Sequence, residues 1–231
     1  MFGPPDNRIT PEDRARVYAL LGFGGADGDR SIPASLDLSA VLDAARLTEL
    51  HARAREESGR HRGRGGPRGL TEFRVGVELR PERLALGFTD VKKGKPNHGG
   101  RELDRTRTIV GTVHTHPWDV AQSIADVRNL LRTNDVVGGV VTSAGRISLL
   151  VKDPDRPDDD RSPFATEAAL QGASLRRAPE LLRRIGVLGT LSAAFDLPIG
   201  ATRDPYIGSV CSGLGLIQYV GEVGDPVLRR S

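Results

Sequence analysis

Residues 109–126 constrain the fold more than any other part of the sequence. They read Ile-Val-Gly-Thr-Val-His-Thr-His-Pro-Trp-Asp-Val-Ala-Gln-Ser-Ile-Ala-Asp. The apolar, β-branched run from Ile109 to Val113 predicts a buried strand, and Pro117, which has no N–H to donate, ends it. Because alternate side chains of a strand lie on the same face, His114 and His116 are expected to point to one place.

A helix is predicted to follow from Ser123, because apolar residues recur at helical spacing at Ile124, Val127, Leu130 and Leu131. Ser-x-x-Asp is most often only a helix cap, and His-x-His also occurs by chance. The ordered combination is more specific. Two imidazoles at a strand end and the carboxylate of Asp126 at the next helix start predict a metal site. Three protein ligands with one open position are typical of catalytic zinc.

This order of residues resembles the signature of the JAMM (JAB1/MPN/Mov34) metalloprotease family: an upstream Glu, then His-Ser/Thr-His-Pro, then Ser-x-x-Asp. The resemblance runs from near Glu72 to Lys152 and includes two predicted strands after the motif helix, over 135–141 and 146–152. It implies an α/β (α+β, three-layer) fold with an MPN-like central mixed sheet flanked by helices. One spacing differs, since residues 117–125 are nine where the family usually has ten. The placement of Ser123 is therefore open at this point.

The resemblance to bacterial-type, deubiquitinase-like members also implies the chemistry. One Zn²⁺ per chain would be held by His114, His116 and Asp126. The general base would be a Glu at the start of the predicted strand 71–79, which favours Glu72 and leaves Glu78 as the main alternative, with Glu56 and Glu57 as weaker candidates. Ser123 would stabilise the oxyanion.

The implied reaction is hydrolysis of the amide after the C-terminal tail of a ubiquitin-like protein, by metal-activated water. Trp118, the only Trp in the chain, either flanks the groove for that tail or covers the shortened loop.

Two other functions remain open. A catalytically inactive MPN-like scaffold typically lacks one or more ligands, whereas all three are present here. A bacterial JAMM branch tied by name to DNA repair shares the signature, and the Arg-Gly-rich residues 59–69 would then bind nucleic acid. Because no aromatic side chain is interleaved among these residues, we favour a solvated linker. Nucleic acid is therefore not the expected partner.

Composition places the chain among soluble globular proteins, with 231 residues, 38% hydrophobic and 27% charged. No apolar run approaches the ~20 residues of a membrane span, and the first residues do not form a secretory signal. We therefore expect a cytoplasmic protein without a membrane partner. The single Cys211 excludes an internal disulfide framework and a Cys-based zinc cluster.

The chain divides into four predicted regions. Residues 1–58 form a helical segment that packs on the core, with one helix capped by Thr10 and a second over about 39–57. Residues 59–69 are a basic linker, 70–190 the catalytic core, and 191–231 an extension with a possible last strand over 214–220. Within the core, residues 90–107 are predicted to be a loop, and 164–175 and 179–185 two helices.

Overall fold

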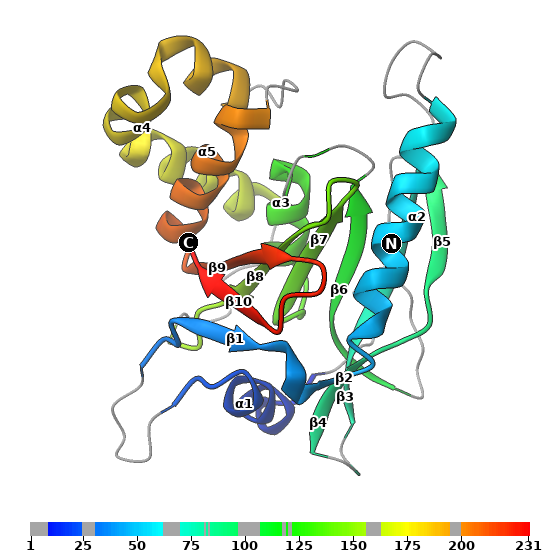
Figure 1. Ribbon diagram of the computed structural model, residues 1–231. Helices are drawn as coiled ribbons and strands as arrows, with labels where there is room; N and C mark the ends of the chain where they lie inside the picture. Colours follow the sequence, from blue (N-terminus) through cyan, green and yellow to red (C-terminus); the bar gives the residue numbers. More distant parts are fainter. Residues whose placement is uncertain are drawn as a thin grey trace.

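The computed structural model describes residues 9–24, 31–61, 70–80, 82, 84–96, 107–116, 119, 122–155, 163–194 and 200–231 (Figure 1). Within these ranges, ten strands form one mixed sheet in the order β1-β10-β9-β8-β7-β6-β3-β4-β2, and β5 pairs with β3. The helices are α1 (Pro11–Leu20), the 3₁₀ helix η1 (Leu38–Ala40), α2 (Ala45–His61), α3 (Ile124–Arg132), α4 (Pro163–Ala194) and α5 (Gly200–Gly213).

The strands are β1 (Ser35–Asp37), β2 (Val41–Leu42), β3 (Thr71–Arg80), β4 (Ala85–Phe88), β5 (Lys92–Pro96), β6 (Thr108–His116), β7 (Val137–Thr142), β8 (Arg146–Lys152), β9 (Leu216–Glu222) and β10 (Val227–Arg230). The expected class, a mixed sheet flanked by helices, is confirmed at this level.

Hydrophobic side chains cover both faces of the sheet. On one face, Leu47 and Leu50 of α2 belong to the same buried cluster as Leu149 and Val151 of β8. On the other face, helices α3, α4 and α5 supply a second cluster that includes Leu150 of β8. Because alternate strand residues enter different clusters, the sheet is buried between two helical layers, with α2 on one side and α3 to α5 on the other (Figure 1).

The centre of the sheet is the parallel pair β6–β7, joined through α3. On its other edge β6 pairs antiparallel with β3, so that His114 lies beside Arg74 on one neighbour and Val140 on the other. This arrangement puts the end of β6 and the start of α3 at the same edge of the sheet. A parallel pair needs such a crossover connection, which brings the helix back over the sheet face.

Several predicted elements have the expected form. Thr10 caps α1 in a capping box with Asp13, and Pro11 occupies the first turn. Strands β7 and β8 form the predicted hairpin, in which Gly145 takes a φ of 93°. That value lies in the left-handed region that glycine adopts without steric cost.

The predicted second helix starts later than expected, so its predicted start near residue 39 is wrong. Asp37 accepts a hydrogen bond from Ser39 N and caps η1, after which Val41 and Leu42 pair with β4 as strand β2. Asp43 then takes a φ of 61°. Val41 and Leu42, which fall inside the predicted helix, therefore pair in the sheet, and α2 begins only at Ala45.

Two other predictions are also wrong. Part of the loop predicted over 90–107 is strand β5, which pairs antiparallel with the first half of β3; residues 97–106 lie outside the described ranges. The two helices predicted over 164–175 and 179–185 are one helix that continues through Pro179, and its non-helical residue is Gly186. Pro179 removes a hydrogen bond to the carbonyl of Leu175. Pro has no N–H to donate to it, and the helix is exposed at this point, since Leu175 is 75% exposed.

The predicted regions share one sheet. Strands β1 and β2 come from residues 1–58, and β9 and β10 come from residues 191–231. Helix α2 extends to His61, into the predicted linker, and the remaining linker residues 62–69 lie outside the described ranges. The 190/191 boundary falls inside α4. None of the described helices has the length and apolar character needed to cross a membrane.

Candidate metal centre

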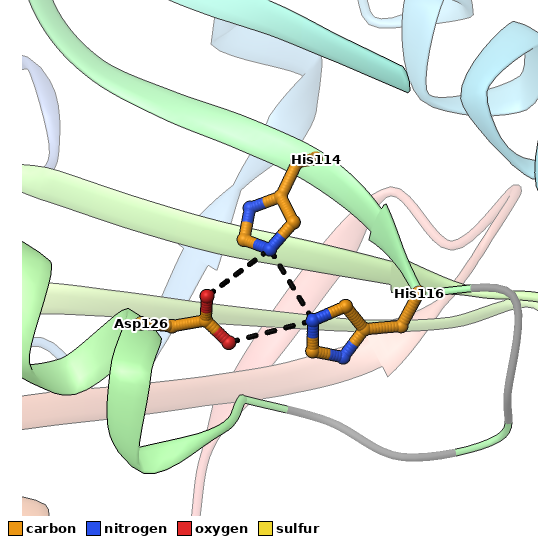
Figure 2. A group of neighbouring side chains, drawn as sticks. All are labelled: His114, His116 and Asp126. Carbon is orange, nitrogen blue, oxygen red and sulfur yellow. Dashed lines mark hydrogen bonds and ion pairs between the residues drawn. The ribbon is translucent and has the colours of Figure 1, made fainter. Parts of the chain in front are cut away.

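His114 and His116 lie at the end of β6 on the face of the sheet that carries α3. Val113, between Thr112 and His114, belongs to the cluster on the α2 face, so its two neighbours point the opposite way. Figure 2 shows both imidazoles turned toward Asp126, which comes from the first turn of α3. The alternation of one strand and the start of the following helix thus bring three potential ligands together.

The three donor groups converge on one point. The Nε2 atom of His114 lies 3.2 Å from Asp126 Oδ1, His116 Nε2 lies 3.4 Å from Asp126 Oδ2, and the two Nε2 atoms are 3.3 Å apart (Figure 2). A tetrahedral zinc with ligand bonds of about 2.0–2.1 Å has donor atoms about 3.3–3.4 Å from one another. Within the described residues, this is the one group of three or more His, Cys, Asp or Glu side chains with metal-ligand spacing.

The chemistry of the donors also suits a zinc ion. The side chains of His114, His116 and Asp126 are 15%, 12% and 18% exposed, so the site is partly shielded yet open on one side. Burial raises the pKa of the Asp126 carboxyl, but attraction and hydrogen bonding from the two imidazoles hold it well below its usual value. Asp126 is therefore a carboxylate at neutral pH, as a metal ligand must be.

Ser123 both caps α3 and contacts a proposed ligand. Its Oγ accepts a hydrogen bond from Asp126 N at 3.2 Å and donates to Asp126 Oδ2 at 2.8 Å, while Ser123 N donates to the same oxygen at 2.7 Å. The predicted helix cap is therefore confirmed. Despite the shorter loop, Ser123 lies beside the carboxylate of Asp126, the proposed ligand.

The two candidate general bases have different surroundings. Glu72 lies near the start of β3, and the antiparallel register that pairs Arg74 with His114 puts Glu72 level with His116. Glu78 is at the other end of the strand, where it pairs with Arg80 at 3.3 Å and Arg107 at 3.4 Å. Of the two, only Glu72 lines the cleft that contains the histidines.

That cleft has a volume of about 340 Å³ and contains most of the predicted site. His114, His116, Ser123, Asp126 and Glu72 all line it, together with Gly138 and Gly139 of β7. Trp118, predicted to flank a substrate groove, lies outside the described residues. The cleft thus offers a possible metal site, a carboxylate and a hydroxyl to one bound molecule.

Sequence reasoning missed residues that hold this site in place. The buried Gln122 donates to Ser148 O at 2.6 Å, which ties the residue before Ser123 to β8. Asp119, in the same loop, accepts from Thr142 Oγ1 at 3.2 Å and from Arg146 Nε at 2.7 Å. These contacts tie Asp119 and Gln122 to β7 and β8, and no local pattern predicts them.

Two further residues hold β3, which carries Glu72. Thr115 Oγ1 accepts a hydrogen bond from Phe73 N at 2.9 Å, and the buried Glu57 accepts from Thr71 N at 2.9 Å. Thr115 has a signal in the sequence, because it lies between the two histidines and must face the other side of β6. Glu57 has none, since its contact depends on how α2 packs.

Comparison of the chain with protein-family models, with curated proteins and with solved structures gave no match.

Proposed function

We propose that the chain is a zinc-dependent metallopeptidase of the JAMM type, with an MPN-like fold. The observation that carries the proposal is the convergence of His114, His116 and Asp126 at tetrahedral spacing in a cleft that also contains Glu72 and Ser123. Zinc hydrolases combine three protein ligands with a nearby carboxylate in this way.

The residues have separate roles in the proposed reaction. When bound, zinc lowers the pKa of a coordinated water toward ~7 and polarises a substrate carbonyl. Glu72 takes the proton of the attacking water and passes it to the leaving amine. Ser123, which donates to Asp126 in this structure, turns its hydroxyl toward the developing oxyanion. Such a donor contributes roughly 3 kcal/mol to the transition state.

The proposed substrate is the C-terminal tail of a ubiquitin-like protein joined to an amine, as the resemblance implies. Chelator-sensitive cleavage of ubiquitin-like fusions is the activity to assay.

Metal content decides between this proposal and an inactive scaffold. Mass spectrometry of the purified protein should find about one zinc per chain, lost in His116→Ala. His51→Ala is a matched control, because that half-buried imidazole contacts Ser143 O at 3.3 Å and does not line the cleft. A wild-type chain that binds no metal even when zinc is supplied would contradict the proposal and favour the scaffold.

Glu72→Gln tests the proposed base. This change keeps the shape of the side chain but removes its ability to take a proton, so zinc content should stay unchanged while the rate of amide hydrolysis falls by ~10²–10⁴-fold. Glu78→Gln, on the same strand, should leave the rate within a few-fold of wild type. Retained activity in Glu72→Gln, with loss in Glu78→Gln, would transfer the role of base to Glu78.

A further inference from the structure

A second cleft lies on the same face of the sheet as the metal centre, between helices α4 and α5 and strands β8 and β9. Its volume is about 590 Å³, and we call it the serine cleft after Ser148, Ser209 and Ser212, which line it with Gln218 and Val220. Clefts of this size accept drug-sized molecules or short peptide segments. None of the roles proposed above uses it.

The serine cleft is elongated along the strands. Gln218, Val220 and Glu222 line it from alternate positions of β9, and four residue steps of a strand cover about 14 Å. On the opposite wall, Ser209 and Ser212 are three residues apart on α5 and so share a helix face. A lining of this length matches about four residues of an extended peptide.

The lining offers uncharged hydrogen-bonding groups and no excess of charge. The charged side chains are Arg146 and Arg177 against Glu180 and Glu222, which cancel formally. Both arginines are already paired, Arg146 with Asp119 at 2.7 Å and Arg177 with Glu180 at 3.2 Å. This balance disfavours phosphate groups and other polyanions. Gln218 donates to Ser148 Oγ at 2.9 Å and Ser212 Oγ accepts from Arg177 at 3.2 Å, so within the described residues the hydroxyl left for a peptide N–H or C=O group is that of Ser209.

Two side chains have surroundings that a bound peptide would complete. Ser209 is 8% exposed, and its Oγ has no hydrogen-bond partner among the described residues. A buried hydroxyl of this kind costs free energy until it finds a partner. Val220 is 37% exposed although it is apolar, and it gives the cleft one surface for an apolar side chain.

The serine cleft is in line with the metal centre. The sheet register runs from His114 to Val140, from Val140 to Ser148, and from Ser148 to Val220. Ser148 is therefore two strands from His114, or about 10 Å. Gln122, which lines the metal cleft, accepts from Ser148 Oγ at 2.6 Å, and Ser148 Oγ accepts from Gln218 Nε2 at 2.9 Å, so a buried row of three hydrogen-bonded side chains connects the walls of the two clefts.

We propose that the serine cleft binds an extended, uncharged peptide segment of the substrate that continues from the amide held at the metal centre. It lies on the β8–β9 side of that centre, away from Glu72 on β3. The proposal rests on the proposed peptidase function for the identity of the peptide. It adds a subsite that selects about four residues beside the scissile bond.

Binding of short peptides tests the proposal without requiring cleavage. The probe is a mixture of acetylated, amidated tetrapeptides of Ala, Ser and Gly, titrated into the zinc-supplied full chain. Backbone amide NMR signals of Ser148, Ser209 and Gln218 should shift and saturate. Inorganic phosphate, and tetrapeptides of the same length with two aspartates, should bind at least about tenfold more weakly. The absence of saturable shifts, or tighter binding of either anion, would overturn the proposal.

Variants remote from the metal locate the binding. Val220→Trp fills the cleft from an exposed position and should weaken tetrapeptide binding by about tenfold or more, as should Ser212→Trp on the opposite wall. Leu175→Trp is the matched control, because Leu175 is 75% exposed on α4 and does not line the cleft. Equal binding by all three variants and the wild type would place the peptide elsewhere.

Ser209→Ala separates a ligand contact from a structural one. Because Ser209 Oγ has no hydrogen-bond partner in the described part of the chain, its removal should not lower Tm but should weaken tetrapeptide binding by about fivefold. A lower Tm with unchanged binding would overturn its role.

Failure of the proposed function is distinguishable from failure of the subsite. Saturable binding that Val220→Trp abolishes, in a chain that cleaves no ubiquitin-like fusion, would keep the cleft as a peptide site and reject the peptidase. Zinc-dependent cleavage that Val220→Trp leaves unchanged would support the peptidase and reject the serine cleft as a substrate subsite.

Discussion

At the scale of the residue, Asp126 combines a structural and a chemical role. Its carboxylate caps α3 and also faces both imidazoles. Asp126→Ala should lower zinc affinity by more than the ~10–100-fold that follows loss of an outer-shell partner, because a ligand itself is lost. Asp13→Ala, in the equivalent capping box of α1, should leave zinc affinity unchanged. Competition with a chromophoric chelator measures both, and equal zinc affinity in Asp126→Ala and wild type would remove Asp126 from the ligand set.

Cys211 should be chemically inert. Burial raises its pKa from 9.0 to about 12, and the thiolate is the reactive form. Alkylation by iodoacetamide at pH 8 should therefore be at least ~100-fold slower in the folded chain than after unfolding, and should not affect hydrolysis. Rapid labelling of the native protein, followed by mass spectrometry, would contradict the buried placement.

The same pKa shift sets a direction for stability at alkaline pH. Because the folded pKa lies above the unfolded value, the contribution of Cys211 is fully present below pH 9.0 and is lost as the pH rises toward about 12. Tyr219, whose pKa burial also raises to about 12, contributes in the same direction. Urea unfolding of Cys211→Ala across this pH range should show a shallower decline than wild type.

At the scale of the element, helices α1 and α3 start with the same device. Thr10 with Asp13 and Ser123 with Asp126 both form capping boxes. Thr10→Ala and Ser123→Ala should each lower the free energy of unfolding by about 1 kcal/mol. Ser123→Ala alone should also reduce kcat by ~10²–10³-fold if its hydroxyl stabilises the oxyanion. Thermal unfolding and hydrolysis rates together separate the two roles, and equal rates in both variants would leave Ser123 as a cap only.

At the scale of the whole molecule, the parallel pair β6–β7 supports the candidate metal centre. A Cβ added at Gly111 would lie 2.1 Å from Val137 O on the neighbouring strand, so Gly111→Ala must move one strand away from the other. We expect a loss of about 3 kcal/mol or more in the free energy of unfolding, together with weaker zinc binding. In Gly59→Ala, on α2, the added Cβ meets nothing within 4 Å, and stability should rise slightly. Denaturant unfolding of both variants checks this, and similar stabilities would contradict the close packing of β6 on β7.

The grouping of His114, His116 and Asp126 could be predicted because its geometry is local. Strand alternation puts His114 and His116 on one face, and a capping motif fixes Ser123 relative to Asp126. Only the approach of α3 to the end of β6 depends on the tertiary fold, and the resemblance to the JAMM family supplied that expectation.

Other features depend on pairing between distant segments and could not be predicted. Strands β2 and β5 are short and have no clear alternation, so their existence depends on the edges that β3 and β4 offer. Likewise, the serine cleft joins residues from β8, α5 and β9 that no sequence motif connects. The anchoring role of Gln122 can be recognised only once β8, whose Ser148 O it contacts, is known to lie next to it.

The pairing of β1 with β10 has a consequence for synthesis on the ribosome. Leu36 lies opposite Leu228 in the same sheet, so β1 acquires this neighbour only after the whole segment between the two strands has been synthesised. Until then β1 presents an unpaired edge, which is a hazard for association between nascent chains. Pairing of β1 therefore cannot precede synthesis of β10, and chaperone binding to residues 35–37 should persist until β10 is available.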